Sequence, residues 1–91
     1  MNPESIVLLG VKRRIIAFRR ETGERLWDQH LGSSTFADTF ISLVADDSRV
    51  YAHTMGEFIC LELMTGAVLW RDPLAGLGYG LASIAIPNAP N

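Results

Sequence analysis

Short apolar runs alternate with short polar or glycine-containing turns along most of the chain. The runs are four or five residues long, rich in Val, Ile, Leu and aromatic residues, and recur every 8–12 residues, which is typical of an all-β protein. No segment combines a helical period of apolar residues with helix caps. The expected strands are residues 6–9, 15–18, 24–28, 40–44, 49–53, 58–62 and 67–71.

The two halves of the chain repeat one motif at an offset of 43 residues. Thr22-Gly23-Glu24-Arg25-Leu26-Trp27 in the first copy is matched by Thr65-Gly66-Ala67-Val68-Leu69-Trp70 in the second. At the same offset Val7 meets Val50 and Ile16 meets Ile59, without a gap. A period of about 43 residues is the size of one four-stranded propeller blade.

Only the second copy contains four strands in sequence order. The first copy lacks the initial strand, and Ser83-Ile84-Ala85-Ile86 aligns with Phe40-Ile41-Ser42-Leu43 at the same offset. The missing strand is therefore expected at the other end of the chain, so that the ends meet inside a blade. The predicted organisation is a single two-blade unit over residues 1–91, with blade 1 (three strands) at 6–35, blade 2 (four strands) at 36–75, and the inner strand for blade 1 of a neighbouring chain at 79–87.

Two blades cannot close a propeller, because propellers use roughly four to eight. An open pair would leave apolar blade faces in water and strand edges unpaired, which invites aggregation. Heterologous contacts close into a ring when the rotation between subunits permits it. We therefore expect an all-β chain of two four-stranded blades, completed head to tail by further copies, with a homotetramer of eight blades favoured and a homotrimer of six blades next.

Composition narrows the possible partners. The chain is 48% apolar and 20% charged, as in ordinary globular domains, and its net charge of −2 gives no electrostatic reason to expect nucleic acid or an anionic membrane. A single cysteine, Cys60, excludes an internal disulfide and cannot build a cysteine-based metal site. The most apolar run, residues 74–86, is too short and too rich in glycine to span a bilayer. The first residues do not read as a signal peptide, so we expect a cytoplasmic protein.

The repeated motif resembles the tryptophan-docking repeat of pyrroloquinoline-quinone-type propellers, the quinoprotein dehydrogenase-like family. That pattern is Ala-x-Asp-x-x-x-Gly-Lys-x-x-Trp, and the chain matches it from Ala17 to Trp27 and, with Cys60 at the Ala position, from Cys60 to Trp70. The Asp position holds Arg19 and Glu62, and the Lys position holds Glu24 and Ala67. These departures are expected to weaken the docking hydrogen bonds and to leave the blade assignment intact. A WD40 repeat is less favoured, because no Gly-His or Trp-Asp signature recurs in both copies.

The resemblance implies that the tryptophans stack between neighbouring blades. It assigns a structural role to Thr22, Gly23, Trp27, Thr65, Gly66 and Trp70. Enzymes of this fold use a quinone, a calcium-like ion, a catalytic Asp and often adjacent cysteines, and none of that set can be placed on this chain. We therefore expect no enzyme activity, no catalytic residues, no cofactor and no metal ligands.

Other chemically suggestive residues have simpler interpretations. Asp46-Asp47 could bind a metal, but turns favour Asp for its own backbone hydrogen bonds. His30 and His53 have no nucleophile or second ligand at a useful spacing, and Cys60 suits a small buried apolar position. Gly76 to Gly80 resembles a phosphate loop, but a strand rather than a helix is expected after it. Basic residues around two turns could clamp a phosphate or an acidic partner, and a solvated loop tip is favoured; these are Lys12, Arg13, Arg14, Arg19 and Arg20.

The leading hypothesis is a non-enzymatic propeller that serves as a binding or assembly scaffold and has itself as partner. One alternative is a ligand-binding propeller, for a sugar or a quinone, with one site per subunit; another is a piece of a longer quinoprotein-like propeller or a chain that works with a partner chain. Fold analogy places any ligand site at the mouth of the central channel. Its expected lining is Thr35, Phe36, Asp38, Gly78 and Tyr79.

Overall fold

A computed structural model describes residues 2–32, 40–78 and 80–87 of the chain. A short 3-10 turn, η1 (Pro3–Ser5), precedes the strands. Within the described residues no helix is long and apolar enough to cross a membrane. The strands are β1 (Ile6–Val11), β2 (Arg14–Arg19), β3 (Arg25–His30), β4 (Ser42–Ala45), β5 (Arg49–Thr54), β6 (Glu57–Glu62) and β7 (Val68–Asp72).

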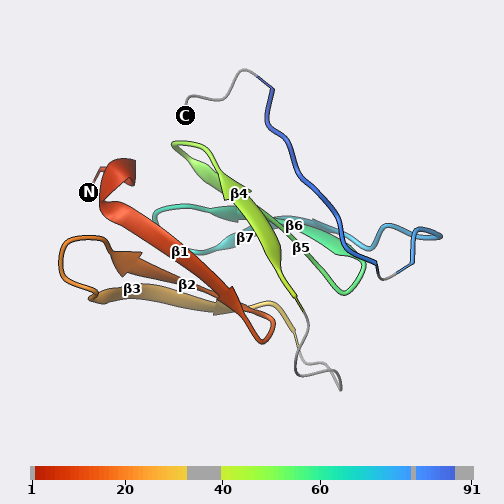
Figure 1. Cartoon of the computed structure of the whole chain (residues 1–91), viewed down its shortest axis with the longest axis horizontal. Coiled ribbons are helices and arrows are strands. Elements are labelled where there is room, and N and C mark those ends of the chain that lie inside the picture. Colours follow the sequence, from red (N-terminus) through yellow and green to blue (C-terminus); the bar gives the residue numbers. More distant parts are fainter. Residues whose placement is uncertain (1, 33–39, 79, 88–91) are drawn as a thin grey trace.

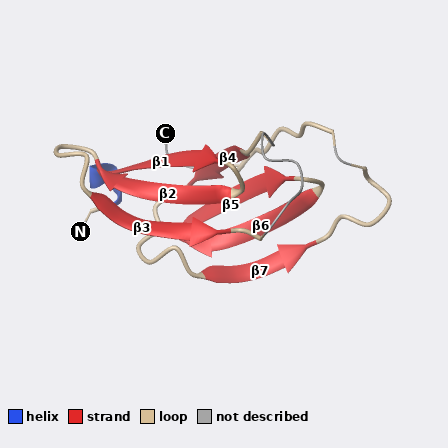
Figure 2. Ribbon diagram, turned by 90° about the horizontal axis from the view of Figure 1, so that it is seen from below, coloured by secondary structure: helices blue, strands red, loops and turns tan. Residues whose placement is uncertain are grey.

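The strands form two antiparallel sheets, which confirms the all-β prediction. The first has the order β1-β2-β3 and the second the order β4-β5-β6-β7, so every strand pairs only with its neighbours in sequence (Figure 1). Seen from the side, the two sheets lie one on the other (Figure 2). We call them the three-stranded sheet and the four-stranded sheet.

The 43-residue repeat extends to backbone detail. The β1–β2 turn has positive φ at Lys12 (50°) and Arg13 (60°), and the matching β5–β6 turn has it at Met55 (51°) and Gly56 (71°). Positive φ at both central residues is the mark of a type I′ hairpin, whose twist suits antiparallel strands. Each sheet also contains one register shift, between Ala17 and Phe18 in one and at the matching position in the other.

The two Thr-Gly turns are also alike. Gly23 and Gly66 have φ of 77° and 78°, a region that glycine enters without steric cost. The hydroxyl of the preceding threonine accepts the N–H of the residue after the glycine, at 3.2 Å in both turns. The motif therefore recurs in both copies because it builds the same turn twice.

The hydrophobic core lies between the sheets. Ile15 and Leu31 contribute from the first half of the chain, and Val50, Ile59 and Leu61 contribute from the four-stranded sheet. All five side chains are fully buried. Their burial fixes which face of each sheet is turned inward, since alternate residues of a strand point to opposite faces.

The structure shifts most predicted strand limits by one or two residues, and two of these shifts are informative. Gly10 does not end the first strand, which continues to Val11. A Cβ atom at Gly10 would lie 2.9 Å from Leu43 Cδ2, so glycine is required there for close approach of the other sheet. The fourth strand begins at Ser42 rather than at Phe40, whose side chain is 65% exposed.

The C-terminal segment is predicted from the repeat to be a strand over residues 79–87. Its described part, residues 80–87, forms no strand within the single chain. Because the predicted partner strand belongs to another copy, that pairing stays a prediction. In Figure 1 the segment, in blue, is an extended trace.

Candidate functional site

Trp27 is the largest side chain between the two sheets. It projects from β3 onto the Thr-Gly turn of the four-stranded sheet, and its Nε1–H donates to the carbonyl oxygen of Leu63 at 2.9 Å. A Cβ atom at Gly66 would lie 2.6 Å from Trp27 Cδ2, so the indole ring rests directly on the glycine. The turn glycine thus has two functions, because it supplies the positive φ and makes room for the ring.

Gln29 adds a second hydrogen bond from the same strand. Its Nε2–H donates to the carbonyl oxygen of Gly66 at 2.8 Å. Together Trp27 and Gln29 bind two backbone carbonyl groups of one turn, so this contact depends on the shape of the turn and not on the side chains within it. The role of Gln29 could not be predicted from the repeat, because its position lies outside the repeated motif.

The two charged positions that depart from the family pattern pair with each other. Arg19 stands at the Asp position and Glu24 at the Lys position, and Arg19 Nε donates to Glu24 Oε1 at 3.0 Å. The two positions therefore carry an ion pair whose charges are the reverse of the Asp and Lys in the pattern. The acceptor for Trp27 Nε1 is the backbone of the opposite sheet, so neither charged residue takes part in that bond.

A charge cluster ties the end of β3 to the four-stranded sheet. Arg71 Nε donates to Glu57 Oε2 at 2.8 Å, and Arg71 also donates to the carbonyl oxygen of Leu31. From the three-stranded sheet, Arg13 donates to the carbonyl oxygens of Leu31 and Gly32, both at 3.2 Å, and lies 3.7 Å from Glu57. These interactions converge on one inter-sheet junction.

This cluster corrects the interpretation of the basic residues. Arg13 was expected at a solvated loop tip, yet it is only 8% exposed because its guanidinium reaches inward to the end of β3. Arg14 pairs with Asp28 at 3.2 Å. Arg19 is engaged by Glu24, so Arg13, Arg14 and Arg19 are each bound by protein groups of their own rather than gathered into one anion-binding surface.

Acid should weaken the junction through Glu57. The hydrogen bond from Arg71 lowers the pKa of the Glu57 carboxyl below its ordinary value, opposed in part by burial. A carboxyl with a depressed folded-state pKa contributes stability above its unfolded pKa, and that contribution is lost as the pH falls through the folded pKa. We expect the wild type to lose more stability than Glu57→Gln between about pH 6 and about pH 3.

Urea denaturation of both chains at each pH measures this difference. The pKa of Asp46 is also lowered, by backbone hydrogen bonds from Ser48 and Arg49, but that effect is common to both chains and cancels in the comparison. Equal losses in the two chains would contradict a stabilising role of the Glu57 carboxylate.

Each sheet has a second face, turned away from its partner, and both are apolar. On the three-stranded sheet this face carries Val7, Leu9 and Val11, which are 50%, 48% and 39% exposed, with Phe18 opposite Val7 in the register. We call it the Val7 face. Single exposed apolar residues are ordinary, but a contiguous apolar face on a soluble protein marks an interaction surface.

The outward face of the four-stranded sheet carries an aromatic cluster, and we call it the Trp70 face. The ring of Trp70 lies 5.4 Å from that of Phe58 and 6.3 Å from that of Tyr51. Trp70 is 40% exposed. Two open hollows of about 280 and 250 Å³ lie between this face and residues 82–87, so the C-terminal segment crosses the face without filling it.

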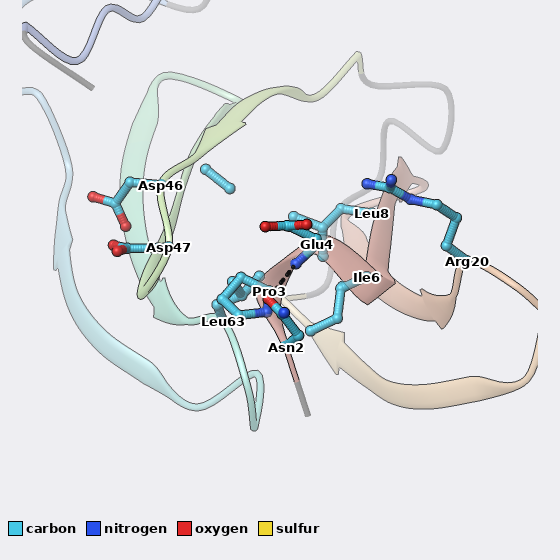
Figure 3. Close-up of a pocket in the computed structure, with 10 residues that line it drawn as sticks. Asn2, Pro3, Glu4, Ile6, Leu8, Arg20, Asp46, Asp47 and Leu63 are labelled. Atoms are coloured by element: carbon cyan, nitrogen blue, oxygen red, sulfur yellow. Dashed lines mark hydrogen bonds between the residues drawn. The ribbon is translucent and has the colours of Figure 1, made fainter. Parts of the chain in front are cut away.

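A pocket lies at the free edge of β1. It is open, has a volume of about 640 Å³, and is lined by Ile6 and Leu8 together with the turn after β4 and the N-terminal residues. Figure 3 places Asp46 and Asp47 on one side of it and Arg20 on the other. In the four-stranded sheet the strand matching β1 is β5, and there the corresponding edge is covered by β4. The pocket therefore borders the position of the missing strand.

The remaining candidates have structural partners. Asp46 Oδ1 accepts the backbone N–H groups of Ser48 and Arg49 at 2.9 and 2.8 Å, as expected of an aspartate in a turn. Asp72 Oδ1 accepts the N–H of Leu74 at 2.8 Å. Cys60 is buried, and burial raises the pKa of its thiol. His53 is buried beside the hollow near Phe58, and His30 is exposed at the end of β3.

Most of the predicted channel-mouth site lies outside the described residues, namely Thr35, Phe36, Asp38 and Tyr79. Gly78 is described; it is exposed with a φ of 74°, and a Cβ atom there would meet nothing within 4 Å. The site therefore stays a prediction. Within the described residues no three His, Cys, Asp or Glu side chains gather as metal ligands would.

A comparison with known families identifies a match over most of the chain. The family model described as the outer membrane protein assembly factor BamB, of the pyrroloquinoline-quinone repeat type, matches residues 3–83. The match includes all seven described strands and both Thr-Gly turns. No curated protein matches the chain.

Proposed function

Because the chain belongs to the pyrroloquinoline-quinone-type β-propeller repeat family, we propose that it is a non-enzymatic binding or assembly scaffold whose copies join head to tail into a closed propeller. The family description names an assembly factor, which is a binding role rather than a catalytic one. A ring of four copies would have eight blades and one of three copies six, both within the usual range.

The observation that carries this proposal is the pair of outward apolar faces, neither of which is covered by another sheet among the described residues. Val7 and Leu9 on one sheet and Trp70 on the other are 40–50% exposed, and they lie on opposite sides of the two-sheet unit. In a head-to-tail ring the Val7 face of one copy would cover the Trp70 face of the next, so one kind of contact would cover both.

A non-enzymatic role is supported by how the acidic side chains are used. Glu57 binds two arginines, Asp28 pairs with Arg14, and Asp46 and Asp72 accept backbone N–H groups of their own turns. Carboxylates engaged in this way stabilise the fold and leave little freedom for acid–base chemistry.

Native mass spectrometry of the purified chain tests the proposal. We expect an assembly of four subunits of 10.0 kDa, with three subunits as the second form that fits a ring. A chain that stays a monomer at micromolar concentration would overturn the proposal and favour a piece of a longer propeller, in which further blades of the same polypeptide cover both faces. Sugar or quinone binding without assembly would favour the ligand-binding alternative.

A further inference from the structure

Each residue in the contact between the two sheets has a counterpart at the matching position of the other repeat copy, and these counterparts do not contact each other. Trp27 rests on Gly66 and donates to the carbonyl oxygen of Leu63. At the 43-residue offset these residues correspond to Trp70, Gly23 and Arg20. Trp70 and Gly23 cannot meet within one chain, because Trp70 lies on the outward face of the four-stranded sheet and the Gly23 turn belongs to the three-stranded sheet.

The Gly23 turn is a vacant version of the Gly66 turn. Its glycine has the same φ to within a degree, and the backbone N–H of Arg20 donates to Ser5 O as that of Leu63 donates to the matching Ser48 O. A Cβ atom at Gly66 would collide with Trp27, whereas one at Gly23 would meet nothing within 4 Å among the described residues. The chain therefore has two turns of the shape that binds an indole ring, and only the Gly66 turn has a ring on it.

From these contacts we infer that Trp70 of one copy docks on Gly23 of the next copy and donates its indole N–H to the carbonyl oxygen of Arg20. The inference rests on the proposed head-to-tail assembly and names the contact that would hold it together. The partner of the Trp70 face is then a second copy of this chain, because the three-stranded sheet carries both the Val7 face and the Gly23 turn.

The C-terminal segment supports the same arrangement. Within the chain, Ile41 and Leu43 lie against Gly10, and the counterparts of these three residues are Ile84, Ile86 and His53. Ile84 and His53 line one of the hollows on the Trp70 face, and Ile86 lines the other. The segment therefore runs over the outward face of the four-stranded sheet, the side on which the repeat places the counterparts of residues 41–43.

The hollows have the character of the space that a neighbouring sheet would fill. In the observed contact the facing side chains are Val50, Ile59 and Leu61, which are fully buried. Their counterparts Val7 and Phe18 belong to the Val7 face, and the third counterpart, Ile16, pairs with Leu9 of that face. Apolar side chains of a second copy would then cover Tyr51, Phe58 and Trp70 and remove them from water.

The contact between copies would differ from the observed one in its polar groups. Gln29, which donates to Gly66 O, is replaced by Asp72, which has no side-chain N–H to donate to Gly23 O. The Glu57–Arg71 pair is replaced by Arg14–Asp28, with the charges exchanged between the two positions. The contact between copies is thus poorer in hydrogen bonds and depends more on the docked tryptophan.

Two variants that damage opposite sides of the contact provide the test. Trp70→Ala removes the docking ring, and Gly23→Asn fills the receptor with a residue that tolerates positive φ. We expect each variant alone to assemble at least about 30-fold more weakly than the wild type, as for a central aromatic anchor. The matched control is Gly76→Asn, at an exposed glycine with a φ of 83° and open space around it, which should assemble as the wild type does.

Mixing the two variants gives the sharpest result. The Gly23→Asn chain keeps its Trp70 and the Trp70→Ala chain keeps its Gly23, so one intact contact can form between them. We expect native mass spectrometry to show a 1:1 heterodimer in the mixture and monomers in each separate sample. Circular dichroism of each variant checks that the sheets are retained.

The outcomes separate this inference from the proposal beneath it. A monomeric wild type would overturn both. If the wild type assembles and Gly23→Asn assembles equally well, the Trp70–Gly23 contact is overturned and the assembly proposal stands. This conclusion does not depend on whether Trp70→Ala folds. If each variant fails to assemble alone and the mixture contains no heterodimer, the Trp70–Gly23 contact is also overturned. That result would indicate that copies meet through the same surface on both sides.

Discussion

Replacing Trp27 with alanine should lower the free energy of unfolding by about 3–5 kcal/mol, the range for truncating a large aromatic residue in a core. The indole ring fills the space against Gly66, and its loss leaves a cavity between the sheets. The carbonyl oxygen of Leu63 also loses its donor. Urea denaturation followed by circular dichroism measures the change.

Two further variants separate the contributions to this effect. Trp27→Phe keeps an aromatic ring against the glycine and removes the N–H, so it should cost about 1–3 kcal/mol, the penalty for an acceptor left without its partner. Trp70→Ala is the repeat-matched control, measured at a concentration where the chain is monomeric. Because Trp70 is 40% exposed, its loss should cost clearly less than that of Trp27. Equal costs would contradict the docking of Trp27 as the main inter-sheet contact.

Gly66→Ala should be the second strongly destabilising change. The φ of 78° alone makes alanine unfavourable by about 1–2 kcal/mol. The new Cβ atom would also lie 2.6 Å from Trp27 Cδ2, so the ring must shift. Overpacking of this kind adds about 1–3 kcal/mol.

Gly23→Ala isolates the second cost. Gly23 has a φ of 77°, and a Cβ atom there meets nothing within 4 Å, so the monomeric variant carries the conformational penalty alone. The difference between the two alanine variants in chemical denaturation therefore measures the contact with Trp27. If both substitutions were equally costly, the indole would not rest on Gly66 in solution.

Most of the fold could be predicted from the repeat. The repeated motif is a local signal, because each copy specifies one turn and one strand. Its copies are recognised by the common offset of Thr22 and Thr65, of Gly23 and Gly66, and of the two tryptophans. Such signals predict elements and their order well. They also predict that Trp27 lies between layers, since a large flat side chain at a fixed place in each repeat suits an inter-sheet position.

The inter-sheet junction could not be predicted in the same way. Arg13 sits in a turn whose composition indicates exposure, and only the path of β3 brings the carbonyl groups of Leu31 and Gly32 within its reach. Glycine usually breaks strands, so the pattern indicates a strand end at Gly10, whereas the glycine here allows close contact with Leu43. The sequence does contain one signal for this junction. Glu57 and Arg71 are matched in the repeat by Arg14 and Asp28, so both charges are reversed together, which indicates a cross-strand ion pair in each sheet.

The meander order of both sheets has a consequence for how the molecule forms. Every strand pairs with the strand next to it in sequence, so each hydrogen-bonded ladder closes a loop of only a few residues. Short loops cost little chain entropy, and contacts of low sequence separation form rapidly. Each sheet can therefore take shape during synthesis before its final neighbour arrives, and the encounter of two finished sheets would set the pace of maturation.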